Sequence, residues 1–198
     1  MRVELGFGPD VVMRLLPHRR PFLMVDTIVA LERGEQPRLF ASRFITANEP
    51  VFEGHFPHLS VWPGVYTIEG MGQTSNVLAI LSLVERGLVA AGHGEDAFVE
   101  GLKNLELAAR LHPGFSVERA AELETLLAHA LPNAASRMGM SAAVDVKLTA
   151  PVFAGSRLDF EVKLTHVIER VCRFEVRAEV AGREVAKGVM KGSFGYGA

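Results

Sequence analysis

Apolar and polar residues alternate along most of the last third of the chain, in residues 144–149, 158–165, 172–180 and 185–194. In the second segment, for example, Leu158, Phe160 and Val162 alternate with charged residues. A period of two is typical of strands with one buried and one solvated face. Gly155-Ser156 and Ala181-Gly182 supply turns between the segments. This pattern predicts an antiparallel sheet with one apolar face.

The first half of the chain predicts two helices and two further strands. A short helix is expected at 9–16, a buried strand at 22–31 and an alternating strand at 39–46. The second helix, expected at 65–86, is apolar or small on most sides, which is typical of a helix buried all round. Its glycines lower helix propensity, so close packing against the sheet must offset them.

Two segments lack a clear pattern. Residues 47–64 contain three prolines and two glycines and no periodicity, and long irregular loops in compact domains are often functional. Residues 87–142 are less regular than the flanks, with a helix expected at 116–130 and Ser116 as its N-cap. We expect one α+β domain over 1–198, with a mostly helical insertion at about 87–142. A single central helix leaves part of the sheet for a second subunit or this insertion to cover.

Composition and charge exclude several classes of protein. The chain has 198 residues, 21 basic and 23 acidic, so it lacks the bulk positive charge of a nucleic-acid binder. One cysteine, Cys172, permits no internal disulfide and is expected to be inert core. The most apolar stretch, 77–84, is far shorter than the ~20 residues of a membrane span. The N-terminus lacks a signal peptide's apolar run. We therefore expect a cytoplasmic protein without membrane insertion.

Three residues around the irregular loop are candidates for chemistry, each with a simpler alternative. His55 suits a general base near neutral pH, or is a loop histidine bonded to a backbone carbonyl. Glu69 is either a carboxylate near a helix start, stabilised by the helix dipole, or a desolvated carboxyl that donates a proton. Gly64 at the helix start offers a backbone N–H to a carbonyl oxygen that gains charge, or simply permits a turn.

Other chemistries find less support in the sequence. His55 and His58 are separated by Pro57 and lack a suitably spaced third ligand, so no metal is expected. His18 is expected to be structural. Phosphate-loop and nucleophile-elbow motifs are absent from the sequence.

Three motifs in order resemble the FabZ-type β-hydroxyacyl-acyl-carrier-protein dehydratases. They are Leu16-Pro17-His18-Arg19-Arg20-Pro21-Phe22-Leu23-Met24-Val25-Asp26, the loop from Asn48 to Pro57, and Pro63-Gly64-Val65 followed by Ile68-Glu69-Gly70-Met71-Gly72-Gln73. The fourteen-residue step from His55 to Glu69 agrees with the family's catalytic pair. The resemblance covers about residues 10–86 and 142–195.

The resemblance implies a hotdog fold, in which a long antiparallel sheet wraps around a central helix. It also implies a homodimer with shared active sites at the interface, in some cases a trimer of dimers. The partner would be an acyl carrier protein, whose phosphopantetheine arm presents the substrate, and we assign docking to Arg19 and Arg20. The acyl chain would enter an apolar tunnel, where we place Phe56, Trp62, Val65 and Ile68. No metal or other cofactor is implied.

The implied reaction is a dehydration within fatty acid or related acyl-chain biosynthesis, so the protein would be a lyase. His55 would remove the proton α to the thioester carbonyl, and the Gly64 amide would stabilise the enolate-like oxygen. Glu69, from the other subunit, would protonate the departing β-hydroxyl to leave a trans-2-enoyl thioester.

The chain departs from the family pattern in three places: His58-Leu59-Ser60 replaces a glycine and a proline, Trp62 replaces a smaller apolar residue, and the 87–142 segment is longer. Two alternatives therefore stay open. One is a hotdog thioesterase in which Glu69 activates water or attacks the carbonyl. The other is a non-catalytic subunit that binds acyl carrier protein.

Overall fold

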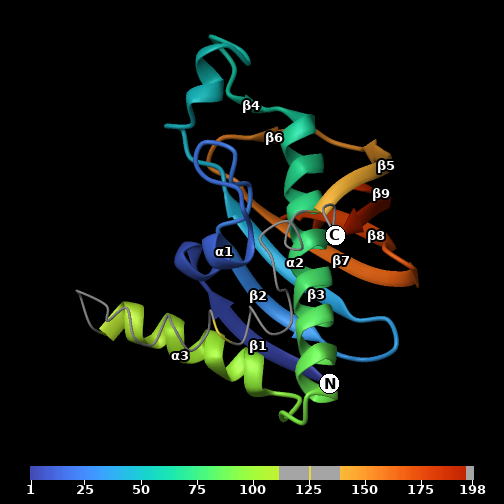
Figure 1. Cartoon of the computed structure of the whole chain (residues 1–198). Helices are drawn as coiled ribbons and strands as arrows, with labels where there is room; N and C mark the ends of the chain where they lie inside the picture. The colour runs from blue at the N-terminus through green and yellow to red at the C-terminus, as the bar shows by residue number, and fades with distance from the viewer. Residues whose placement is uncertain (112–124, 126–138, 195–198) are drawn as a thin grey trace.

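A curved antiparallel sheet and one long helix dominate the computed structural model, which describes residues 1–111, 125 and 139–194 (Figure 1). Seven strands form the main sheet in the order β1-β2-β3-β7-β8-β9-β5. Their bounds are β1 Arg2–Phe7, β2 Thr27–Glu32, β3 Arg38–Phe44, β5 Gly139–Leu148, β7 Arg157–Ile168, β8 Val171–Val180 and β9 Arg183–Phe194. A second sheet pairs β4 (Val61–Trp62) with β6 (Val152–Phe153). Every pairing is antiparallel, as the alternating pattern predicted.

Helix α2 (Gly64–Ala90) lies against the concave side of this sheet and contacts β3, β5, β7, β8 and β9 (Figure 1). Most of its side chains from Met71 to Leu81 are buried, so the prediction of a helix buried all round is confirmed for its middle, whereas Val65 and Val89 near its ends are exposed. It begins one residue earlier and ends four residues later than the sequence predicted. Gly70 permits the close approach, because a Cβ there would collide with the Phe160 ring of β7.

Two shorter helices cover the β1 end of the sheet. Helix α1 (Pro9–Leu15) matches the predicted first helix almost exactly in its bounds, and helix α3 (Ala97–Leu111) packs against α1, α2 and β1. Phe98, Val99 and Leu102 of α3 are fully buried in the common core. The start of the segment expected as an insertion is therefore helical and packed, whereas the helix expected at 116–130 falls outside the described residues, Thr125 excepted.

Three predictions of elements were wrong in detail. Strand β2 starts at Thr27 instead of residue 22, because the N–H of Met24 bonds to the Gln73 side chain of α2, 2.8 Å away, instead of joining a ladder. The edge strand β1 was not predicted. The loop 47–64 is not wholly irregular, since it holds a 3-10 helix (η1, Pro50–Glu53) and β4.

Strand β5 ends the sheet on the side opposite β1 and pairs only with β9 in the described structure. Its side chains are largely exposed, including Met140, Val144 and Leu148. Unpaired backbone groups and exposed apolar side chains on an edge strand favour pairing with another chain. The α+β class and the hotdog arrangement of sheet around helix are confirmed. Among the described helices, none is long and apolar enough to cross a membrane.

Candidate active site

His55 lies in the loop between η1 and β4, where its ring is held by one hydrogen bond. Its Nδ1 is 2.8 Å from the carbonyl oxygen of Val61, and its ring stacks on that of Phe56, with centroids 4.4 Å apart. A carbonyl oxygen only accepts, so in the neutral ring Nδ1 carries the proton and Nε2 keeps its lone pair. The two alternatives from the sequence are thus compatible, because the carbonyl bond orients the ring that can act as a base.

A cavity of about 360 Å³ adjoins His55 and is also lined by Gly64 and Leu148. Gly64 is the first residue of α2, so its N–H has no carbonyl acceptor within the helix and lies at the positive end of the helix dipole. A Cβ at Gly64 would overlap Cδ1 of Leu148, so this exposed side chain would have to turn away. A histidine ring and the N–H of a helix start therefore line one cavity.

Trp62 closes another side of this cavity and is itself almost completely buried. Its ring meets Tyr66 edge-on at 5.2 Å between centroids and Phe52 at 6.2 Å. The aromatic contacts fix the large side chain as a wall of the cavity. Of the tunnel residues expected from the sequence, it alone is among the described residues that line either cavity discussed here.

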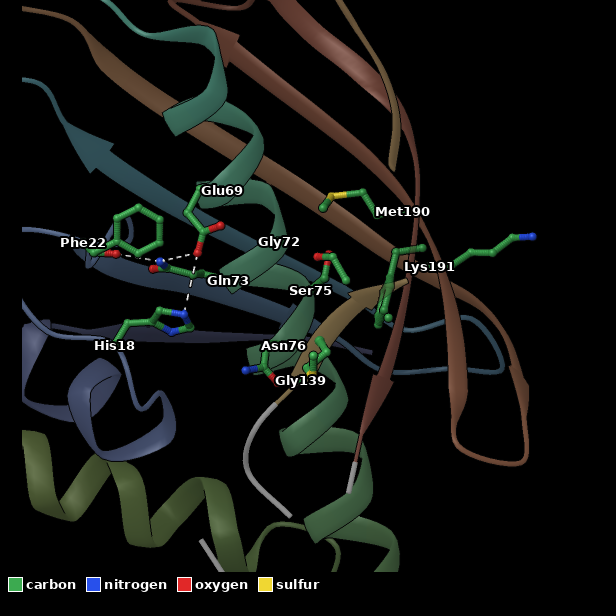
Figure 2. A pocket seen from close by; sticks show the side chains of 14 residues that line it. His18, Phe22, Glu69, Gly72, Gln73, Ser75, Asn76, Gly139, Met190 and Lys191 are labelled. Atoms are coloured by element: carbon green, nitrogen blue, oxygen red, sulfur yellow. Dashed lines mark hydrogen bonds and ion pairs between the residues drawn. The ribbon is translucent and has the colours of Figure 1, made fainter. Parts of the chain in front are cut away.

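Glu69 lines a second cavity of about 240 Å³, and its carboxylate is held by neighbouring side chains (Figure 2). Its Oε1 accepts a hydrogen bond from Nε2 of Gln73 at 2.8 Å, and Nε2 of His18 lies 3.6 Å from the same oxygen. The Glu69 side chain is 30% exposed in the single chain. The carboxyl is therefore partly covered and presents its second oxygen to the cavity.

Gln73 connects Glu69 to the first motif. Its Nε2 also donates to the Phe22 carbonyl at 2.8 Å, and its Oε1 accepts the Met24 N–H at 2.8 Å. Neither Gln73 nor the neighbouring His18 was singled out from the sequence as a site residue. The signal for Gln73 was its position four residues after Glu69, on the same helix face.

His55 and Glu69 line separate cavities in the single chain, and no described residue lines both. Strand β5 runs between the two cavities. Its first residues, including Met140, line the Glu69 cavity, whereas its last residue, Leu148, lines the His55 cavity.

Arg43 of β3 fastens the first two motifs to the sheet. Its guanidinium pairs with Asp26 at 2.7 Å and Glu49 at 2.8 Å, and it lies over the Trp62 ring, 5.8 Å from the centroid. The three partners come from the first motif, the histidine loop and the wall of the His55 cavity. Arg43 therefore sets how the loop that carries His55 sits on the sheet.

The remaining predicted site residues lie as follows. Phe56 and Val65 are exposed, and Ile68 packs against the core. Arg19 donates to the Leu16 and His18 carbonyls at 2.9 and 2.8 Å, whereas Arg20 is exposed. Within the described ranges, no group of three His, Cys, Asp or Glu residues could hold a metal ion.

Comparison with known proteins places this geometry in a family. A family model described as a FabA-like domain matches residues 16–124. The chain is 48% identical over 80 residues to the 3-hydroxyacyl-[acyl-carrier-protein] dehydratase FabZ of Nitratiruptor sp., covering 40% of this chain and 53% of the relative. It is 39% identical over 103 residues to FabZ of Roseiflexus castenholzii, covering 52% and 66%. The chain thus spans about half to two thirds of these relatives' length.

A solved structure shares the fold at low identity. The dehydratase heterocomplex ApeI:P from Xenorhabdus doucetiae contains a chain that matches with a TM-score of 0.53 and 18% identity, covering 92% of this chain and 90% of that one. The family model matches more than half of the chain, and its match contains all three motifs and both halves of the candidate site. The chain therefore belongs to the FabA-like domain family and shares the sequence motifs of its FabZ-type dehydratases.

Proposed function

We propose that this protein dehydrates a β-hydroxyacyl thioester, carried on acyl carrier protein, to a trans-2-enoyl thioester. The observation that carries the proposal is the pairing of His55 with the Gly64 N–H in one cavity, beside an edge strand that leads to the Glu69 cavity. The FabZ relatives named above support the reaction class.

The proposed first step is removal of the proton α to the thioester carbonyl. Nε2 of His55 is the base, because Nδ1 is committed to the Val61 carbonyl. The carbonyl oxygen gains negative charge as the proton leaves, and the Gly64 N–H at the helix start stabilises that charge. Both groups are held by the fold before substrate arrives, so little reorganisation is needed.

The proposed second step is protonation of the departing β-hydroxyl by Glu69. Nε2 of Gln73 donates to Oε1 of Glu69, which leaves the other carboxyl oxygen to carry the proton. The C–O bond breaks as the hydroxyl takes this proton, and water leaves. His55 gains one proton and Glu69 loses one, so the pair is reset by proton exchange after product release.

We infer that a second subunit joins the two halves of the site. Val144 lies midway between Met140 and Leu148 on the exposed β5 edge. Antiparallel pairing of two β5 strands about a two-fold axis at Val144 places the partner subunit's Met140 opposite Leu148. The partner's Glu69 cavity then lies beside the His55 cavity, and each dimer carries two complete sites.

The test is substitution of each half of the site. We expect His55→Ala and Glu69→Gln each to lower hydration of an enoyl thioester by about a hundredfold or more, since each removes a proton-transfer group. Loss of enoyl absorbance measures the reaction, and size-exclusion chromatography measures assembly. His58→Ala, on an exposed histidine of the same loop, is the matched control.

Mixing the two inactive variants tests the sharing of sites. Random exchange of subunits makes half of the dimers mixed, and each mixed dimer has one intact site, so about a quarter of the activity should return. Near-normal activity in either single variant would overturn the proposed reaction, whereas full loss without rescue would overturn the shared site. Thiol release without any enoyl signal would indicate a thioesterase instead.

The remaining expectations from the sequence belong to the same proposal. Carrier-protein docking at Arg19 and Arg20, the absence of a cofactor, assembly into a trimer of dimers and a cytoplasmic location all stay predictions. So does the description of residues 87–142 as an insertion in a single domain.

A further inference from the structure

Asn76 is a buried amide near the middle of α2, at the end of a run of buried polar residues, 73–76, and just before an apolar run. It is 6% exposed, and within the described part of the chain its Oδ1 has no hydrogen-bond partner. Val77, Leu78 and Ala79, which follow it in the helix, are fully apolar and buried. Buried polar atoms are nearly always hydrogen-bonded, so an unpartnered one beside a cavity indicates a ligand group that completes it.

The cavity beside Asn76 is the one that contains Glu69 (Figure 2). Glu69, Gly72, Gln73 and Asn76 share one face of α2, and the seven-residue step from Glu69 to Asn76 spans about 10 Å along the helix. Gly72, between them, has no side chain to block the cavity, and Phe174 and Met190 form apolar walls opposite. Other lining residues are polar, among them Ser75 and Ser141. An acyl chain whose β-carbon lies at Glu69 therefore passes Gly72 and the two apolar side chains on its way toward Asn76.

A plain alkyl chain fits this end of the cavity poorly. It would displace water from the Asn76 amide and offer no hydrogen bond in return, which is the costly case for a buried polar group. Sites built to hydrogen-bond a substrate group discriminate strongly against the analogue that lacks it. An acyl chain that has a hydrogen-bond donor at the right carbon bonds to the Asn76 amide and keeps its apolar contacts along the rest of its length.

We propose that Asn76 recognises a second polar substituent, a hydroxyl or another hydrogen-bond donor, on the acyl chain of the substrate. This inference rests on the proposed function, because it takes Glu69 as the position of the β-carbon. Each carbon of an extended chain advances about 1.25 Å, as its bond length and angle require. The substituent therefore lies about eight carbons beyond the β-carbon. The substrate class is a β-hydroxyacyl thioester that is functionalised again near the far end of the chain.

Binding of unreactive ligands tests this without requiring turnover. Pairs of acyl-pantetheine amides of equal length, one unsubstituted and one with a hydroxyl moved stepwise over the carbons around the expected position, are titrated by calorimetry. The wild-type protein should bind the best hydroxylated ligand about tenfold to a hundredfold more tightly than its plain partner. Asn76→Leu should lose that preference. Thr74→Val, which removes a buried hydroxyl that bonds the Gly70 carbonyl, should keep it.

A second variant guards against misfolding of Asn76→Leu. Gly72→Ala adds a methyl group 3.3 Å from Cε of Met190, halfway between Glu69 and Asn76, and should also abolish the preference by narrowing the cavity. If the wild-type protein binds both members of every pair with equal affinity, the inference is overturned, and an ordered water is then the partner of Asn76. Retained preference in Asn76→Leu or Gly72→Ala would overturn it too. Turnover of a plain β-hydroxyacyl thioester reports separately on the proposed function.

Discussion

At the residue scale, the carboxylate of Glu69 depends on a neighbour that is itself fully engaged. The Gln73 amide bonds to Glu69, to the Phe22 carbonyl and to the Met24 N–H, so its orientation is set from three directions. The side chain therefore links the proposed acid to the backbone of the first motif. A group positioned in this way loses little freedom when the substrate binds.

Replacing Gln73 by Met should separate positioning from stability. The change keeps the side-chain length but leaves the Met24 N–H and the Phe22 carbonyl without partners, which costs about 1–3 kcal/mol of unfolding free energy. We expect kcat to fall about tenfold or more with a smaller change in KM, because Glu69 loses its fixed orientation. Gln73→Glu keeps an acceptor for Met24 and should recover part of the stability but not the activity. Unchanged kcat in Gln73→Met would contradict a positioning role.

Cys172 shows the opposite case, a reactive residue type made inert by its surroundings. Burial in β8 raises the pKa of its thiol, so the reactive thiolate is disfavoured in the folded protein. Stability should therefore fall as the pH rises through the ordinary thiol pKa, because only the unfolded chain ionises freely there. We expect slow alkylation by iodoacetamide near neutral pH and fast alkylation in urea. Equal rates in the two conditions would show that the thiol is accessible in the fold.

At the scale of elements, the contact between α2 and the sheet depends on glycine. The backbone of α2 approaches β7 at Gly70 so closely that a methyl group would overlap the Phe160 ring. Glycine lowers the helix propensity at this position, but the close approach that it permits buries the helix against the sheet. The same helix holds Gly64, Glu69, Gln73 and Asn76, so its distance from the sheet sets the geometry of both cavities.

Gly70→Ala should therefore destabilise the protein although alanine favours a helix. Overpacking costs about 1–3 kcal/mol, which outweighs a propensity gain of about 1 kcal/mol. The midpoint of urea unfolding measures the change. Gly94→Ala is the matched control, because nothing lies within 4 Å of a Cβ at Gly94, and it should change stability by less than about 0.5 kcal/mol. A Gly70→Ala variant more stable than the wild type would mean that the Phe160 ring of β7 moves aside at little energetic cost.

At the scale of the whole molecule, the single chain leaves its site divided and its β5 edge open. Both features have one proposed solution, pairing of β5 with its symmetry mate about Val144. Any partner that covers the β5 edge would bury its exposed side chains. Joining the two cavities requires one particular register, in which the Met140 end of one β5 strand lies opposite the Leu148 end of the other.

Charges at Val144 test this register. Val144→Lys and Val144→Glu each place two like charges across the two-fold axis, which should weaken the dimer and lower the activity. Mixing the two variants pairs opposite charges and should restore the dimer, as measured by analytical ultracentrifugation. The same pair of substitutions at Val89, an exposed valine near the end of α2 that lines a cavity with the β2–β3 turn and not with β5, should leave assembly unchanged. Stable dimers in both single variants would rule out the proposed axis.

The sequence by itself determined the alternation that builds the sheet, the buried character of α2 and the motifs that contain His55, Gly64 and Glu69. These depend on local periodicity and residue type, which are readable along the chain. The tertiary structure alone decided that Gln73 withdraws Met24 from a strand, that Arg43 ties Asp26 to Glu49, and that Asn76 lines the cavity of Glu69. Each of these joins residues far apart in the chain or depends on which helix face meets a cavity, and periodicity carries no information about such contacts.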